Sequence, residues 1–441
     1  MDPTESPPHE FTRRAAMGAM AAGAVLATSR GRAEEPPAAG CPRPRIAAIV
    51  TCYWKTSHGQ GIVDRFMDGY GWGGRHHRPA LDVVSLYVDQ RPKNDLTDER
   101  LARHPGLKLY PTIADALKRG TDTLDVDGVV LIGEHGDYLR DDRGRTHYPR
   151  YEFFKQVVDV FRETGKTAPV FNDKHLSWNW DWCREMVATA RELDFPFLAG
   201  SSLPLTWRIP DYETPDGAGI EEAVCVGYGG VDSYDFHGLE SLQCLVERRR
   251  GGETGVKAVE AIRGEEVWKT LDPAAGGSSR TKALFDSCLC RSFRLASPRE
   301  GYGNAFPTLA DAARLVPDPY LYRIHYSDGL VGSLYMMNGL VADFTVALKL
   351  EGEPAIKSTQ LYLCGISPNQ TLPNFFSPLA NHIEAMFLTG AAPYPVERTL
   401  LTSGVVCKAV DLMAEKRRMV ETPDMATIAY RVSGESQYMR S

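Results

Sequence analysis

The sequence has no excess of basic residues and no cysteine pattern typical of a metal site or a disulfide framework. Its 50 Lys and Arg residues are outnumbered by 57 Asp and Glu, for a formal net charge of −7 and an isoelectric point near 5.9. Such a chain lacks the basic face that nucleic-acid binding requires. The nine cysteines include no C-x-x-C pair, and their scattered, odd-numbered spacing predicts neither a metal site nor structural disulfides. The expected partner is therefore a small molecule, not nucleic acid.

No apolar run is long enough to span a bilayer, which needs about 20 residues. The N-terminus nevertheless carries a pattern typical of export, because Arg13 and Arg14 precede the Ala- and Gly-rich stretch 15–28. We expect residues 1–40 to be a twin-arginine export signal and linker, the protein to be periplasmic, and no stable membrane anchor to remain. The alternative is a disordered tail.

The length of 441 residues is enough for two domains with their own cores. In residues 41–199, buried-strand patterns alternate with helical patterns, which indicates a parallel sheet covered on both faces. The expected strands are 46–50, 83–88, 128–132 and 169–171, and the expected helices are 62–68, 112–118, 151–164 and 181–193. This alternation predicts a Rossmann-like, doubly wound domain.

In residues 200–441 the pattern changes to strands separated by turn residues such as Asn338 and Gly339, at hairpin spacing. The expected strands are 221–227, 320–325, 331–337, 344–350 and 359–364, and the expected helices are 236–249, 381–389 and 398–416. The sequence thus predicts an α/β protein whose C-terminal α/β domain, 200–441, holds a large and mostly antiparallel sheet.

The first turn between strand and helix lacks the glycines that its position calls for. A doubly wound domain normally holds a dinucleotide pyrophosphate there with a G-x-G-x-x-G run. Here the turn over residues 51–55 reads Thr-Cys-Tyr-Trp-Lys, which leaves Thr51 and Tyr53 as candidate cofactor contacts. Asp89, after the second strand, can take the ribose-binding place, although it follows the turn by about twice the usual spacing. The insertion 69–78 accounts for that distance, and the alternative is an ordinary surface acid.

Polar residues cluster after the third and fourth expected strands. Glu134 and His135 follow the third, and Asp173, Lys174 and His175 follow the fourth. Ligands of an open parallel sheet bind outside the carboxyl ends of its strands, so we expect these residues to contact a substrate. A lysine at such a strand end can hydrogen-bond a substrate hydroxyl and stabilise developing negative charge on its oxygen. Lys174 is therefore a candidate catalytic residue.

His237 lies in the first turn of the expected helix 236–249. The free N–H groups and dipole of a helix N-terminus disfavour imidazolium, which keeps a neutral base available. Glu240 follows three residues later on the same face, and Asp232 precedes the helix. We expect His237 to be a catalytic base and the two acids to contact the substrate. The alternative is a structural histidine in the core.

After residue 40 the whole chain resembles the glucose–fructose oxidoreductase/inositol dehydrogenase (Gfo/Idh/MocA) family of NAD(P)-dependent sugar oxidoreductases. Segment 172–175 stands where that family has Glu-Lys-Pro, with Lys174 at its lysine. Segment 232–240 is similar to its G-G-x-x-x-D-x-x-x-H-x-x-D pattern, with His237 at its histidine and Glu240 in place of its later acid. Residues 388–398 resemble its closing segment.

The resemblance implies a Rossmann domain followed by an open α/β domain whose sheet often forms an oligomer interface, so a homo-oligomer through the C-terminal sheet is expected. It also implies that His237 takes a hydroxyl proton from a carbohydrate or polyol while hydride leaves for a tightly held NAD or NADP, and that Lys174 orients the substrate. The chain departs from the family in its glycine-free turn, in His175 replacing proline, and in one extra residue between Asp232 and His237.

Two other functions remain open on the sequence. A divalent metal could serve a lyase or hydrolase acting on sugars in the same cleft, although no H-E-x-x-H spacing supports it. Its ligands would come from His135, His175, His237, Glu134, Asp137 and Asp173. A carbohydrate-binding protein without catalysis would instead stack Trp178, Trp180 and Trp182, together with Tyr53 and Trp54 of the first turn, on sugar rings.

Overall fold

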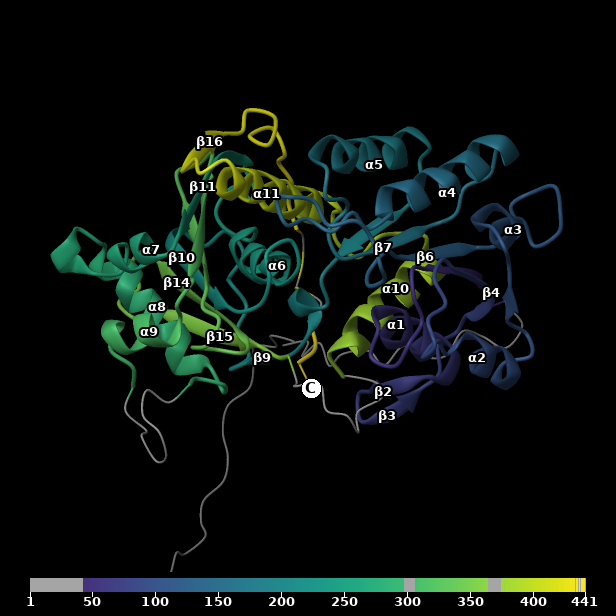
Figure 1. Cartoon of the computed structure of the whole chain (residues 1–441), viewed down its shortest axis with the longest axis horizontal. Helices are drawn as coiled ribbons and strands as arrows, with labels where there is room; N and C mark the ends of the chain where they lie inside the picture. The colour runs from purple at the N-terminus through teal and green to yellow at the C-terminus, as the bar shows by residue number, and fades with distance from the viewer. Residues whose placement is uncertain are drawn as a thin grey trace, which may run out of the picture. The chain divides into compact units, whose positions relative to one another are not determined.

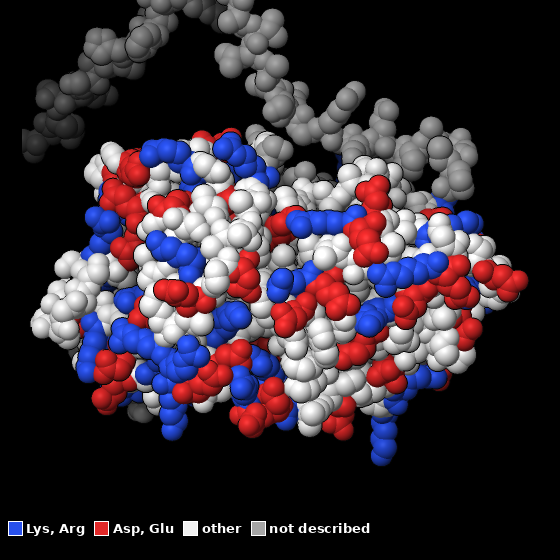
Figure 2. All heavy atoms as spheres, turned by 90° about the horizontal axis from the view of Figure 1, so that it is seen from above, with Lys and Arg blue, Asp and Glu red and all other residues white. Residues whose placement is uncertain are grey.

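The computed structural model describes residues 43–296, 306–363, 374–432, 434, 436 and 438–440, so the predicted export signal lies outside the described residues. None of the described helices is long and apolar enough to cross a membrane. On the described part of the face drawn in Figure 2, acidic and basic side chains are interspersed.

The first sheet has six strands in the order β5-β4-β1-β6-β7-β8, and all of its pairs are parallel. The strands are β1 (Arg45–Val50), β4 (Asp82–Val88), β5 (Lys108–Leu109), β6 (Gly128–Ile132), β7 (Val170–Asp173) and β8 (Phe197–Gly200). Every residue of β6 is buried, as expected for a strand covered on both faces. The four strands expected from the sequence are all present, and β5 and β8 extend the sheet at its two edges.

Helices cover both faces of this sheet, and their ends follow local sequence. They are α1 (His58–Asp68), α2 (Thr97–Arg103), α3 (Ile113–Lys118), α4 (Arg150–Thr164) and α5 (Trp180–Glu192). Ser57 caps α1 by accepting a hydrogen bond from the Gln60 N–H, which satisfies one of the free donors of the first turn. The insertion after α1 forms a hairpin of β2 (Tyr70–Trp72) and β3 (Arg75–His77).

The second sheet has eight strands in the order β16-β11-β12-β13-β10-β14-β15-β9, in which β10 and β13 pair in parallel and the other pairs are antiparallel. The strands are β9 (Arg208–Ile209), β10 (Ile220–Gly227), β11 (Val256–Arg263), β12 (Tyr320–Tyr326), β13 (Val331–Met336), β14 (Phe344–Leu350), β15 (Lys357–Leu361) and β16 (Met419–Glu421). The predicted fold class, a parallel sheet followed by a large mostly antiparallel one, is confirmed.

Both faces of the second sheet are covered by this chain. Successive strand residues point to opposite faces, and Ala223 and Cys225 pack with α6 (Tyr234–Val246) while Val224 and Val226 pack with α8 (Ser279–Arg291). The helices α7 (Glu265–Lys269) and α9 (Leu309–Leu315) lie on the α8 side, as Figure 1 shows. Helices of this chain therefore pack on both faces of the sheet, and the homo-oligomer through the C-terminal sheet stays a prediction.

The last two long helices return toward the first sheet. The helix α10 (Ser377–Thr389) packs beside α1, and α11 (Glu397–Ala414) contacts both α5 and α6 (Figure 1). The ring of Phe387 occupies the space where a Cβ at Gly128 would be, 2.6 Å from its nearest atom. The first sheet thus ends at residue 200 and the second is built from later residues. Helices from the C-terminal part nevertheless complete the core of the first sheet, and residues 42–441 form one compact unit. Short 3₁₀ helices occur at Leu203–Leu205, Pro273–Ala275 and Asn374–Phe376.

Candidate active site

A cavity of about 480 Å³ lies at the carboxyl ends of the parallel strands. The predicted residues Glu134, His135, Lys174 and His237 all line it, although they come from three separate parts of the chain. His58, from the first turn of α1, lines it as well. The structure therefore brings together the two candidate catalytic residues, Lys174 and His237, and two of the expected substrate contacts.

Lys174 directly follows β7, and its side chain is buried. Its Nζ lies 3.3 Å from Glu134 Oε1 and 5.6 Å from the centre of the Tyr234 ring. The backbone of Lys174 is left-handed, with φ at 65°, and so is that of His135 with φ at 70°. A non-glycine residue in this conformation costs about 1–3 kcal/mol, and such residues concentrate at functional sites.

Glu134 is held as a carboxylate. Its Oε2 accepts a hydrogen bond of 2.6 Å from Arg150 Nη2, and Lys174 lies on the other oxygen. Burial raises the pKa of Glu134, but Lys174 and Arg150 together outweigh it and hold the pKa well below the ordinary value. Because it stays ionised, Glu134 cannot donate a proton near neutral pH. It positions the ammonium of Lys174 instead.

His237 lies on α6 in the wall of the cavity, and its imidazole is neutral. Its Nδ1 lies 2.6 Å from Ser201 Oγ, and its ring packs edge-on against Tyr234. Burial lowers the pKa of His237 well below the ordinary 6.5, and the charge of Lys174 lowers it further. The expected neutral base is therefore supported, but burial and a neighbouring cation are the main causes here, in place of the helix N-terminus.

His135 is also neutral. Burial is the first cause that lowers its pKa, to about 4, and His58 adds to the effect. Its ring lies edge-on to Trp54, with 5.6 Å between ring centres. A histidine that remains uncharged can accept or donate one hydrogen bond at the cavity without adding positive charge.

His58 was not predicted from the sequence. Its Nδ1 lies 2.6 Å from Oδ2 of Asp173, and the Asp173 side chain is only 2% exposed. Asp173 was expected to contact the substrate, but its carboxylate instead pairs with the His58 ring. Only its position could have identified His58 from the sequence, because a polar side chain at the start of the first helix stands where a phosphate normally binds in this fold.

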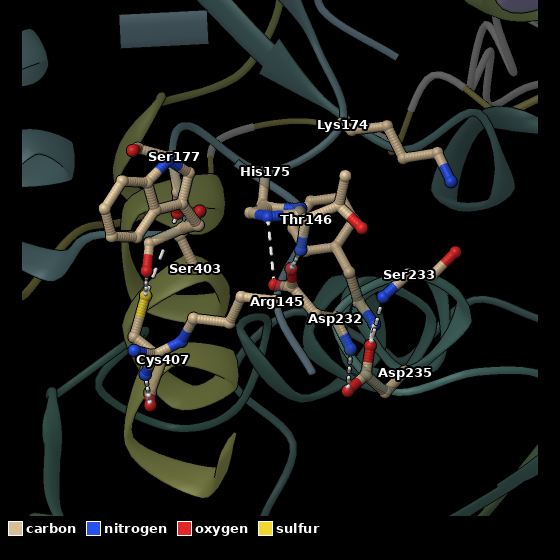
Figure 3. Close-up of polar contacts among 12 residues, drawn as sticks. Arg145, Thr146, Lys174, His175, Ser177, Asp232, Ser233, Asp235, Ser403 and Cys407 are labelled. Carbon is tan, nitrogen blue, oxygen red and sulfur yellow. Dashed lines mark hydrogen bonds and ion pairs between the residues drawn. The ribbon is translucent and has the colours of Figure 1, made fainter. Parts of the chain in front are cut away.

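Three other expected substrate contacts do not reach the cavity. His175 Nε2 lies 3.3 Å from Asp232 Oδ1, and Asp232 Oδ2 accepts a hydrogen bond from the Thr146 N–H. Figure 3 shows His175 and Asp232 facing each other while the Lys174 side chain extends away from them. Glu240 is fully buried and accepts a 2.7 Å hydrogen bond from Thr402 Oγ1. These three residues tie loops and helices together beside the site, which corrects their expected role.

The residues expected to hold a cofactor are bonded within the protein. Thr51 Oγ1 donates to the Glu134 carbonyl at 2.6 Å, and the fully buried Tyr53 donates from its hydroxyl to Asp64 at 2.5 Å. The two carboxylate oxygens of Asp89 accept from the hydroxyls of Tyr87 and Tyr138. Thr51 and Tyr53 thus use these groups within the protein, whereas the exposed Asp89 keeps further acceptor sites, and nucleotide contact by Thr51, Tyr53 and Asp89 stays a prediction.

The loop after β6 packs against the first strand–helix turn and the end of β4. A Cβ added at Gly136 would lie 3.1 Å from Cys52 Sγ and 3.2 Å from Gln90 Oε1. The Asp137 N–H donates to Gln90 Oε1 at 2.8 Å, and Gln90 Nε2 donates back to the Asp137 carbonyl at 3.1 Å. The loop after β6 is thus joined to Gln90 and packs closely against Cys52. These residues do not fit the ordinary pyrophosphate grip of a doubly wound domain.

The side chains invoked by the two alternative functions mostly interact within the chain, although Nδ1 of His135 and Nδ1 of His175 have no hydrogen-bond partner in the described part of the chain. No group of three or more His, Cys, Asp or Glu able to hold a metal ion occurs among the described residues. Trp178 stacks on His147 at 3.8 Å, Trp182 stacks on Tyr151 at 4.5 Å, and Trp180 Nε1 donates to Asp424. The tryptophan platform expected for a sugar-binding protein is therefore wrong, because two of these rings stack on this chain and the third is buried and bonded to it.

Comparison with known proteins identifies the fold. No protein-family model matches the sequence, and neither does any curated protein. The structure of GenD2 from gentamicin A biosynthesis in complex with NAD matches 87% of this chain and 97% of its own, with a TM-score of 0.53 and 12% identity. The chain has the GenD2 fold. A myo-inositol dehydrogenase from Lactobacillus casei, in complex with NAD(H) and myo-inositol, matches 90% of this chain and 100% of its own, with a TM-score of 0.49 and 10% identity.

Proposed function

We propose that this chain is a Gfo/Idh/MocA-type oxidoreductase that acts on a carbohydrate or polyol in the cavity at the strand ends. The observation that carries the proposal is the meeting of a buried lysine and a neutral histidine, Lys174 and His237, at the two positions that resemble the working residues of that family. The shared fold with GenD2 supports the same assignment.

The two residues have complementary roles on one hydroxyl group. The ammonium of Lys174, held by Glu134 at 3.3 Å, donates a hydrogen bond to the substrate oxygen and stabilises its developing negative charge. His237 accepts the hydroxyl proton, because burial and Lys174 keep its imidazole neutral. Such general-base assistance contributes about 10²- to 10⁴-fold to a rate.

NAD or NADP is the proposed hydride acceptor, because GenD2 was solved with NAD and the sequence resembles an NAD(P)-dependent family. Thr51 and Tyr53 bond within the protein, and the exposed Asp89 accepts hydrogen bonds from Tyr87 and Tyr138. Export by the twin-arginine route and tight retention of the nucleotide complete the proposal, supported by Arg13 and Arg14 before the apolar stretch.

Nucleotide occupancy tests the redox proposal most directly. The full-length protein, purified and heat-denatured, should release NAD(H) or NADP(H) into the supernatant, where mass spectrometry identifies it. Added polyols such as myo-inositol should then reduce the bound nucleotide. A protein that releases none, shows no thermal shift with either nucleotide, and oxidises no polyol would refute hydride transfer.

A second function is favoured by the His58–Asp173 pair, which brings another imidazole to the cavity. A nicotinamide-independent lyase or hydrolase acting on carbohydrates would use the same cavity and need no pyrophosphate grip. Turnover of a sugar by protein shown to be free of nucleotide would support it, and nucleotide-dependent turnover alone would argue against it.

A further inference from the structure

The cavity contains one more proton-handling group than the oxidation of a hydroxyl requires. His237 supplies the base for that reaction from α6, in the second half of the chain. His58 reaches the same cavity from α1, in the first half. Among the described residues, the one hydrogen bond of the His58 ring is to Asp173, so its Nε2 has no partner. The ring therefore has a free nitrogen and no task in the oxidation.

The His58–Asp173 pair has the geometry of an oriented base. A buried carboxylate that accepts the Nδ1 proton of an imidazole leaves the lone pair on Nε2. Oδ2 of Asp173 lies 2.6 Å from Nδ1 of His58, and the Asp173 side chain is 2% exposed, so the pair has the spacing and burial for this arrangement. Phe376 packs edge-on against the ring at 5.0 Å, and His135 lies 5.4 Å away on another side. These contacts hold the ring in one orientation.

The charges around His58 suit a substrate that develops negative charge on oxygen. Lys174 is the buried cation of the cavity, and Glu134 keeps it there at 3.3 Å. His135 and His237 are both neutral, because burial lowers the pKa of each. An enolate oxygen placed at Lys174 would face its ammonium ion, which the ionised Glu134 holds from another side, with the neutral imidazoles of His135 and His237 in the same cavity. This is the electrostatic setting that removal of a proton next to a carbonyl requires.

We propose that His58, oriented by Asp173, removes and returns a proton on the carbon next to the carbonyl of a keto-sugar or keto-polyol, an inference that rests on the proposed carbohydrate function. The C–H bond breaks and an N–H bond forms at Nε2 of His58. The electron pair of the C–H bond forms a carbon–carbon double bond, and the carbonyl oxygen becomes an enolate stabilised by Lys174. The substrate loses no electrons, so the step needs no oxidant, and a ketone is what the proposed oxidation produces.

Deuterium uptake from heavy water into the substrate tests this step. The full-length protein is incubated with myo-inosose or D-fructose, and NMR and mass spectrometry follow the carbon-bound hydrogens. Wild-type protein should catalyse uptake, and His58→Gln should lower the rate by about 10²-fold or more. Added imidazole should restore part of the rate in His58→Ala, where the side chain is missing. The exposed His76→Gln serves as the matched control and should exchange at the wild-type rate.

Asp173 acts through His58, so its variant is read by spectroscopy as well as by rate. In Asp173→Asn the deuterium uptake should fall, and heteronuclear NMR of the histidine rings should show that His58 has lost its single Nδ1-protonated tautomer. A rate that falls with the tautomer unchanged would contradict the positioning role.

The outcomes separate this inference from the oxidoreductase proposal. Wild-type protein that exchanges neither ketone, or exchange that His58→Gln leaves intact, overturns the inference even if polyols are still oxidised. Exchange that depends on His58 supports the inference whether or not polyols are oxidised, and polyol oxidation by nucleotide-loaded protein decides the oxidoreductase proposal separately.

Discussion

Replacement of Glu240 by glutamine should change stability in a pH-dependent way and leave catalysis intact. Glu240 is fully buried on α6, and burial raises its pKa from 4.5 to about 7. Its oxygens accept hydrogen bonds from Thr402 Oγ1 at 2.7 Å and from the Ser201 N–H at 3.3 Å. The folded protein therefore keeps the Glu240 proton at pH values where the unfolded chain has already lost it.

The sign of the effect follows from proton linkage. Between pH 4.5 and 7 the folded state binds this proton and the unfolded state does not, so the free energy of unfolding falls as pH rises through that range. The interval between the two pKa values corresponds to about 3 kcal/mol. Glutamine cannot ionise and keeps one acceptor oxygen. The variant should match wild type within about 1 kcal/mol at pH 5 and exceed it by about 2 kcal/mol at pH 8.

Urea unfolding of both proteins at pH 5, 6, 7 and 8 measures this difference, with the exposed Glu351→Gln as control. The gap between the Glu240→Gln and wild-type midpoints should widen with pH, whereas the control gap should stay constant. A gap that does not change with pH would refute the buried-acid argument. A loss of catalytic activity in Glu240→Gln would support the hypothesis, drawn from the sequence, that Glu240 contacts the substrate.

Three further predictions address the cavity and the covered sheet. Lys174→Met removes the cation at the substrate oxygen and should lower kcat/KM by about 10²-fold or more, measured with the substrate that wild-type protein turns over; an unchanged kcat/KM would exclude Lys174 from the reaction. Because burial and Lys174 hold the pKa of His237 below 6.5, the base stays available as pH falls, so the acidic limb of the kcat/KM profile should lie below pH 6.5. An acidic limb above pH 6.5 would contradict this. Phe285→Ala empties a buried position between α8 and the sheet and should cost about 3–5 kcal/mol of unfolding free energy. A cost below 1 kcal/mol would mean that α8 does not seal that face.

Much of the site follows from local sequence. Lys174 and Glu134 follow neighbouring parallel strands, and the carboxyl ends of such strands meet at one edge of the sheet. Strand and helix patterns were therefore enough to expect that they converge. His237 was expected as a neutral base for a local reason, its helix N-terminus, whereas burial and Lys174 account for most of its lowered pKa.

Other features depend on contacts that sequence spacing does not contain. His58 and Asp173 are 115 residues apart, and they meet because α1 packs beside the end of β7. Asp89 follows a strand end as expected, but the hydroxyls of Tyr87 and Tyr138 occupy its oxygens. Polar residues at loop starts look alike in sequence whether they face a ligand or bond to the chain itself.

The sequence alone determined the alternation of strands and helices, the change of sheet type near residue 200, and the missing glycines of the first turn. Those properties are local, because hydrophobic period and turn chemistry act over a few residues. The tertiary structure decided what packs against the first turn, where Gly136 lies beside Cys52 and Gln90, and it placed α8 on one face of the second sheet. These outcomes depend on close packing between segments that are distant in the sequence. Such contacts form only when the whole chain is folded.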